Sequence, residues 1–264
     1  MTSLDATNPL TRLVFETRTE KPRDQGITMM ADWGLDPQRQ ANLLSVAGPF
    51  IDQAKIAVGI GALLSQDVLT QKLESYRQHD IVPFPGGQFL EHAVLNNKRD
   101  EYLQAVTAAG FDTIEVSDNL LEISLDEKCE IIRTAREQHG LRIFGEVGKK
   151  EGMASTVDLA DDAARCLESG SEIVFLEAAD FFSDDVNEEM LEKIISRCGL
   201  QPLVFELPGP WIEGVTLSDV HQMTCWLLNR FGTDTNIANV GVDEVLKLEA
   251  LRLKIGVNAG GEES

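Results

Sequence analysis

The apolar positions along this chain follow two alternating periods. Short runs rich in apolar and β-branched residues predict strands at 27–32, 54–58, 81–84, 113–116, 142–147, 172–176, 203–205 and 235–238. Between and after them, apolar residues recur at the 3.6-residue spacing of amphipathic helices over 37–47, 66–79, 98–109, 125–139, 157–169, 187–198, 217–230 and 241–254. Strict alternation predicts parallel strands, because a parallel neighbour requires a crossover connection.

Eight strand–helix pairs in 264 residues predict an α/β fold, a closed (β/α)8 TIM barrel that forms a single domain. An open, doubly wound sheet is the alternative. We expect an N-terminal tail over 1–20, the barrel over 21–256 and a C-terminal tail over 257–264.

Charge is distributed unevenly. Residues 1–99 hold 10 basic and 11 acidic residues, whereas residues 100–264 hold 13 and 33, which gives the chain a net charge of −21. Such a surface repels nucleic acid and anionic membranes, so we expect neither as a partner. No apolar run approaches the roughly 18 residues of a membrane span, and the start lacks a signal-peptide pattern. Four dispersed cysteines without metal-ligand spacing predict reduced thiols in a cytoplasmic protein.

Candidate chemistry lies at the C-terminal ends of the strands, where (β/α)8 barrels place their active sites. Acidic residues lie at or near five of these ends, namely Asp32, Glu115, Glu146, Glu177 and Glu206. Glu146, Glu177 and Glu206 come from consecutive strands, and hard oxygen ligands without Cys or His suit Mg²⁺. For any single acid the alternative is an ion pair with a neighbouring lysine or a loop cap.

Basic residues on the same side of the barrel are few. Lys55, Lys149 and Lys150 lie there, and burial would bring the pKa of Lys149 or Lys150 towards the neutral range that a general acid or base needs. A surface lysine pair is the alternative. Gly86-Gly87 favours either an anion cradle or a tight turn. Trp33 either lines a pocket or packs on a neighbouring loop.

Taken together, the motifs resemble those of the phosphosulfolactate synthase family from about residue 20 to 255. The matching segments are Lys21-Pro22-Arg23-x-x-Gly26-Ile27-Thr28, Asp32-x-Gly34-Leu35, Phe50-Ile51-Asp52-x-x-Lys55, Pro85-Gly86-Gly87-x-x-x-Glu91, Gly110-Phe111-x-x-Ile114-Glu115-Val116-Ser117, Glu146-Val147-Gly148-Lys149-Lys150, Phe205-Glu206-x-Pro208, Asn236-x-Ala238-Asn239 and Leu248-Glu249-x-Leu251-Arg252. The family also includes plant heat-stress-associated proteins.

The resemblance implies a Mg²⁺-dependent lyase of sulfonate biosynthesis that adds sulfite to phosphoenolpyruvate, a small anionic carboxylate. It implies Lys149, with Lys150 beside it and Glu115, as catalytic residues, and Glu146, Glu177 and Glu206 as metal or supporting acids. The implied substrate-binding residues are Asp32, Trp33, Lys55, Gly87, Glu91, Ser117 and Asn239. The resemblance further implies a homo-oligomer, a trimer.

The chain differs from the family pattern at three places. Trp33 stands where the family has Lys, the arginine after Glu177 is lost, and the family's Arg-Gly-Asp-Thr ending is absent. Two alternatives to sulfite addition onto phosphoenolpyruvate follow. One keeps the site but takes a related nucleophile and a less anionic enol- or acrylate-type acid, and the other is a non-catalytic, stress-associated or scaffolding protein. A further alternative is an unrelated barrel aldolase whose Lys55 or Lys149 forms a Schiff base.

Overall fold

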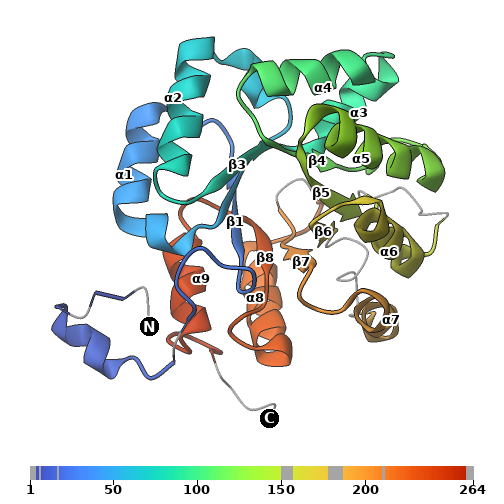
Figure 1. The fold of residues 1–264 in the computed structure, drawn as a ribbon. Helices are drawn as coiled ribbons and strands as arrows, with labels where there is room; N and C mark the ends of the chain where they lie inside the picture. The colour runs from blue at the N-terminus through green and yellow to red at the C-terminus, as the bar shows by residue number, and fades with distance from the viewer. Residues whose placement is uncertain are drawn as a thin grey trace.

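Eight parallel strands form the centre of the structure, and helices surround them (Figure 1). The computed structural model describes residues 4–5, 7–16, 18–149, 157–177, 187–209 and 212–259. The strands are β1 (Thr28–Asp32), β2 (Gln53–Ile56), β3 (Val82–Pro85), β4 (Thr113–Val116), β5 (Arg142–Val147), β6 (Ile173–Leu176), β7 (Leu203–Glu206) and β8 (Ile237–Val240).

The order of the strands is β3-β2-β1-β8-β7-β6-β5-β4, and each described ladder is parallel. β3 and β4, at the two ends of this order, contact each other, so the sheet curls into a nearly closed barrel. The sequence-based prediction of a (β/α)8 barrel is confirmed, and the open doubly wound sheet is not.

The helices lie close to their predicted positions, with one addition. They are α1 (Pro37–Ala47), α2 (Gln66–Arg77), α3 (Gly87–Leu95), α4 (Arg99–Ala108), α5 (Leu125–His139), α6 (Leu159–Ser169), α7 (Glu188–Cys198), α8 (Leu217–Phe231) and α9 (Val245–Arg252), with 3-10 turns η1 (Pro9–Leu13), η2 (Gly48–Phe50) and η3 (Ile60–Leu63). The periodicity did not predict α3, because this helix starts directly at the glycine pair, with Gly86 as its N-cap.

The last strand also begins later than predicted. Asn236, expected inside a strand at 235–238, instead donates its side-chain amide to the carbonyls of Gln201 and Leu203, at 2.9 Å each. Its side-chain oxygen accepts from the Ile27 amide at 2.9 Å. The residue therefore ties the starts of neighbouring strands together, and β8 begins after it at Ile237.

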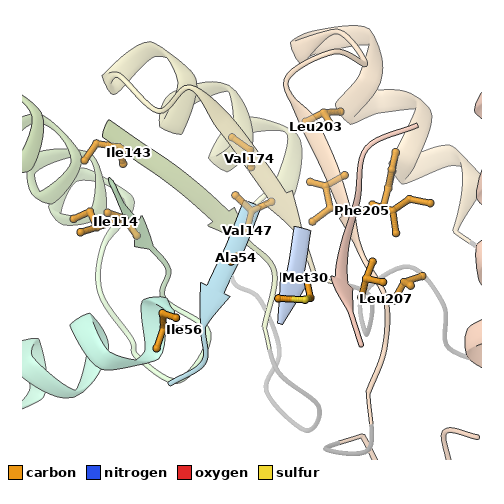
Figure 2. Close-up of a cluster of buried hydrophobic side chains, with 14 of the residues drawn as sticks. Met30, Ala54, Ile56, Ile114, Ile143, Val147, Val174, Leu203, Phe205 and Leu207 are labelled. Atoms are coloured by element: carbon orange, nitrogen blue, oxygen red, sulfur yellow. The ribbon is translucent and has the colours of Figure 1, made fainter. Parts of the chain in front are cut away.

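Apolar side chains alternate between two cores. Side chains that face the helices fill the layer between barrel and helices, and Figure 2 labels ten of them on the strands and their ends. They are Met30, Ala54, Ile56, Ile114, Ile143, Val147, Val174, Leu203, Phe205 and Leu207. The intervening positions face the barrel axis and form a smaller core of Met29, Phe84, Phe144, Ile173, Phe175, Val204 and Ala238.

This alternation decides which strand residues reach the barrel mouth. Phe144 and Phe175 pack edge to face inside the barrel, with ring centroids 6.0 Å apart. Two residues further along each strand, the next axis-facing side chains are Glu146 and Glu177. The acids thus form the layer of axis-facing side chains that follows the smaller apolar core towards the C-terminal ends of the strands.

The N-terminal segment with η1 lies outside the ring of helices (Figure 1). Among the described residues, none of the helices combines the length and the apolar character that crossing a bilayer requires.

Candidate active site

A cavity of about 380 Å³ opens at the C-terminal ends of the strands. Its lining residues come from β1, β2, β4, β5, β8 and the loops that follow the strands, and they are Ala31, Trp33, Lys55, Ala57, Val58, Gly86, Gly87, Gln88, Glu115, Asn119, Leu120, Glu146, Ile212 and Asn239. One lysine and two glutamates thus face a largely apolar space of the size that holds a small molecule.

Lys55 lies at the floor of this cavity between two carboxylates. Its Nζ is 2.8 Å from Glu115 Oε2 and 2.8 Å from Glu206 Oε1, and it lies 5.0 Å from the centroid of the Phe175 ring. Burial lowers the pKa of Lys55, but the carboxylates of Glu115, Glu206 and Glu146 more than offset it and leave the pKa above its usual value. The ammonium therefore keeps its charge at neutral pH.

Glu115 connects this lysine to the start of α3. Its Oε1 accepts the backbone amide of Gly87 at 2.9 Å, while Oε2 pairs with Lys55. Burial raises the pKa of Glu115 well above its usual value of 4.5; Lys55 opposes the shift, and Glu146 adds to it. The site thus contains a carboxyl group that holds its proton more tightly than an exposed glutamate does.

Only glycine fits at position 87, because neighbouring side chains approach its backbone closely. A Cβ atom built there would lie 2.4 Å from Ser117 Oγ and 2.9 Å from Glu115 Oε1. Any side chain would displace the carboxylate that pairs with Lys55. The glycine pair forms the start of α3, with Gly86 as its N-cap, and this helix start packs directly against the site.

Three glutamates form a cluster with the geometry of a cation site. Carboxylate oxygens of Glu146, Glu177 and Glu206 lie within 4.8 Å of one another, and all three residues are buried. An all-oxygen, triply acidic set fits a hard divalent cation such as Mg²⁺ rather than a soft metal. The residues that the sequence singled out as metal ligands are thus brought together.

Lys149 occupies a different position. Its Nζ donates to the Asp118 carbonyl at 2.5 Å, to Asp118 Oδ2 at 2.8 Å and to the Leu121 carbonyl at 2.8 Å. It is not among the residues that line the cavity. In this conformation Lys149 fixes the loop between β4 and α5, while Lys150 lies outside the described residues.

Asp32, expected in the pocket, faces the helices instead. Strand alternation turns Ala31 inwards and Asp32 outwards, where Asp32 Oδ2 lies 2.8 Å from Lys72 Nζ and 2.7 Å from Tyr76 Oη. Its Oδ1 accepts the amides of Gly34 and Leu35. The aspartate therefore shapes the loop that carries Trp33, and it does not line the cavity.

Glu91 and Ser117 also lie just outside the cavity lining. The Glu91 carboxylate accepts the Ser117 hydroxyl, the Asn119 amide at 3.1 Å and the Leu120 amide at 2.7 Å. Burial raises the pKa of Glu91, and these donors oppose the rise. Glu91 thus holds the loop whose Asn119 and Leu120 form one wall of the cavity.

The other expected binding residues, Trp33, Gly87 and Asn239, do line the cavity. Trp33 is 56% exposed at its rim. Sequence reasoning missed Asn119, Gln88 and Ile212. Asn119 comes three residues after β4, and this position at a strand's carboxyl end was the only available signal.

The fold is shared with solved enzyme structures of low sequence identity. A 3-hexulose-6-phosphate synthase superposes with a TM-score of 0.53 at 15% identity, over 87% of this chain and 100% of that chain. A dihydrodipicolinate synthase from Agrobacterium tumefaciens gives a TM-score of 0.55 at 10% identity, over 89% of this chain and 75% of that chain. At such identities these likenesses establish the barrel alone.

Sequence comparison is more specific. Phosphosulfolactate synthase from Methanothermobacter thermautotrophicus is 30% identical over 89% of this chain and 91% of its own length. The enzyme of the same name from Bacillus subtilis is 27% identical over 91% and 94%, and Protein HEAT-STRESS-ASSOCIATED 32 from Arabidopsis thaliana is 26% identical over 90% and 89%. The family model described as (2R)-phospho-3-sulfolactate synthase (ComA) matches residues 16–257. The chain therefore belongs to the phosphosulfolactate synthase family of carbon–sulfur bond-forming lyases.

Proposed function

We propose that this protein adds sulfite, or a related nucleophile, to phosphoenolpyruvate or a similar enol- or acrylate-type carboxylic acid, with Mg²⁺ as its cofactor. One observation carries the proposal. Lys55, Glu115 and Glu146, the last a member of the glutamate cluster, line a single cavity at the C-terminal end of the barrel, in a chain of this lyase family.

Glu146, Glu177 and Glu206 would hold the Mg²⁺, because their carboxylate oxygens approach within 4.8 Å of one another. A bound Mg²⁺ supplies a Lewis acid that draws negative charge towards a substrate carboxylate. The chemistry of the cluster supports this assignment, since three buried glutamates whose oxygens lie close together offer the hard, anionic ligands that a divalent cation such as Mg²⁺ prefers.

The reaction balances without an external oxidant or reductant. The sulfur of sulfite bonds to the methylene carbon of phosphoenolpyruvate, and the electrons of the double bond move towards the carbon that bears the carboxylate. That carbon then takes one proton, and the phosphate ester stays intact. The protein must therefore bind two anions, stabilise charge on a carboxylate and deliver one proton.

Lys55 would stabilise the developing charge. Its ammonium is fixed by Glu115 and Glu206 and stays protonated, so it is preorganised and needs no rearrangement as charge appears. The start of α3 at Gly86 and Gly87 also lines the cavity, and the positive end of its helix dipole favours an anionic group there.

Glu115 would deliver the proton, because burial raises its pKa and the residue lines the cavity. Lys149, with Lys150 beside it, remains the alternative donor that the family resemblance implies. For Lys149 to act, its ammonium would have to exchange its contacts with Asp118 and Leu121 for the substrate.

A less anionic substrate is the second candidate. Trp33, Val58 and Ile212 line the cavity, and Trp33 stands where the resemblance expects a lysine. An indole at the rim favours an apolar substituent over a second phosphate- or sulfonate-like charge.

The family resemblance also favours a homo-oligomer, a trimer, in the cytoplasm, and light scattering on the purified protein tests the assembly.

The experiment incubates purified protein with phosphoenolpyruvate, sulfite and Mg²⁺ and measures the product by mass spectrometry. We expect sulfite-dependent product that disappears with a chelator and in Glu177→Gln. Glu172→Gln is the matched control, because Glu172 is exposed and pairs with Arg142, the first residue of β5. Absence of product with phosphoenolpyruvate but turnover of a less charged acid would favour the second candidate. Absence of turnover with every acid tested would favour a non-catalytic protein.

A further inference from the structure

A second cluster of buried charges lies directly behind the cavity wall. Lys128 on α5 is 1% exposed at its side chain and contacts three separate elements. Its Nζ lies 2.8 Å from Asp118 Oδ1 in the loop after β4, 2.7 Å from the backbone carbonyl of Glu146 at the end of β5, and 3.1 Å from both carboxylate oxygens of Asp162 on α6.

One of these contacts reaches a member of the glutamate cluster. The carbonyl that Lys128 binds belongs to Glu146, whose carboxylate lies with those of Glu177 and Glu206 in the mouth. A carbonyl held in place also holds the backbone of Glu146, and with it the direction of the glutamate side chain. Lys128 therefore contacts the backbone of Glu146 from the helix side, whereas a cation would bind the carboxylate of the same residue inside the barrel.

A second contact reaches the loop that Lys149 fixes. Asp118 divides its carboxylate, with Oδ1 on Lys128 and Oδ2 on Lys149 at 2.8 Å. The same loop contributes Asn119 and Leu120 to the cavity wall. Two lysines and two aspartates, Asp118 and Asp162, thus form a charge-balanced chain.

Stability alone is a poor explanation for such a chain. Burying charged groups costs free energy, and apolar side chains of similar volume are often at least as stabilising. What the charges add is direction, since each hydrogen bond fixes one atom of one element. Partners behind the residues that bind a metal typically change metal affinity by about 10–100-fold when removed.

We propose that Lys128 is a positioning residue for the metal site, which it holds in register by tying the Glu146 carbonyl to Asp118 and Asp162. The proposal rests on the proposed function only in taking the glutamate cluster to bind a divalent cation. Its readout is therefore metal binding, measured without substrate.

The test uses Mn²⁺ as a probe, with free ion measured by electron paramagnetic resonance in titrations of the whole protein. Lys128→Met alone would leave buried aspartates short of a cation and threatens folding. The variant Lys128→Met/Asp162→Asn removes one charge of each sign and leaves Asp118 paired with Lys149. We expect this double variant to fold, as checked by thermal unfolding, and to bind Mn²⁺ at least about tenfold more weakly than the wild type.

Lys72→Met/Asp32→Asn is the matched control, because it also removes one buried charge of each sign. Lys72 is equally buried, but its ammonium contacts Asp32 at the end of β1, the carbonyl of Leu35 and the ring of Tyr76 rather than β5. We expect this control to lose stability and to keep wild-type Mn²⁺ affinity.

Unchanged Mn²⁺ affinity in the folded Lys128→Met/Asp162→Asn variant would overturn the proposal, as would a wild type that does not bind Mn²⁺. A wild type that binds Mn²⁺ but makes no sulfite adduct would contradict the proposed reaction and leave the role of Lys128 standing.

Discussion

The ammonium of Lys55 on β2 lies 2.8 Å from Oε1 of Glu206 on β7, across the inside of the barrel. β1 and β8 separate these two strands in the sheet, so the contact spans the barrel rather than running along a ladder. A long side chain can make it because Phe175 and its apolar neighbours fill the space below, which leaves the lysine at the level of the acids. The only cation among the described lining residues is thereby placed at the floor of the cavity.

Replacement of Lys55 tests this placement. Lys55→Met removes the preorganised cation, and we expect kcat to fall about 10²–10³-fold, the usual cost of losing one such group. The variant should also lose about 3–5 kcal/mol of stability, because the buried Glu115 and Glu206 would lose the ammonium that lies between them. Steady-state kinetics and thermal unfolding measure both. Lys247→Met, in an exposed pair with Glu244, is the control, and equal effects of the two substitutions would refute the assignment.

Gly87→Ala tests the close approach of α3. The added methyl group would meet Ser117 Oγ at 2.4 Å, so we expect a loss of about 1–3 kcal/mol in stability. Activity should fall as well, since Glu115 would be displaced from Lys55. Gly61→Ala is the control, because its Cβ would meet its nearest neighbour only at 4.0 Å. Urea unfolding compares them, and a Gly87→Ala protein as stable as the wild type would contradict the packing.

The raised pKa of Glu115 predicts a pH dependence. A carboxyl group whose pKa is higher in the folded protein binds more protons there than in the unfolded chain, so its contribution to stability falls as pH rises above about 4.5. Glu115→Gln removes this contribution. We expect the free energy of unfolding of the variant, relative to the wild type, to increase between about pH 5.5 and about pH 8. Urea unfolding at both values measures it, and a pH-independent difference would exclude the shift.

The fold was accessible from the sequence because each element carries its own signal. The predicted helices 37–47 and 125–139 and the predicted strands 113–116 and 142–147 coincide with α1, α5, β4 and β5. The failures have local causes. α3 begins at a glycine, which has low helix propensity, and Asn236 uses its side chain to bridge strand starts rather than to continue a strand.

The site was only partly accessible. Glu146, Glu177 and Glu206 were identified because they lie at or near the ends of consecutive strands, and the structure shows that these positions face the barrel axis. Asp32 ends a strand on the outward phase, and its charge is satisfied by Lys72 and Tyr76 on α2. Sequence position alone cannot distinguish these two cases, and it did not reveal that Asp118, rather than the cavity, binds Lys149.

Trp33 provides a test of substrate charge. Trp33→Lys would place a cation at the rim, and a charge-assisted hydrogen bond worth about 1.5–3 kcal/mol would lower the KM for phosphoenolpyruvate about 10–100-fold. Trp33→Phe keeps an apolar ring without the charge and serves as control. A KM that is the same in both variants would show that the rim does not contact the anionic end of the substrate.

The most direct test of the central claim follows the proton and the phosphate together. Wild-type protein is incubated with phosphoenolpyruvate, sulfite and Mg²⁺ in D₂O, and the product is analysed by ³¹P and ¹H nuclear magnetic resonance. The proposed reaction predicts a product that keeps its phosphate ester, gains sulfite at the methylene carbon and carries one deuteron at the carbon bearing the carboxylate. Release of inorganic phosphate, or phosphoenolpyruvate that remains unchanged under these conditions, would contradict it.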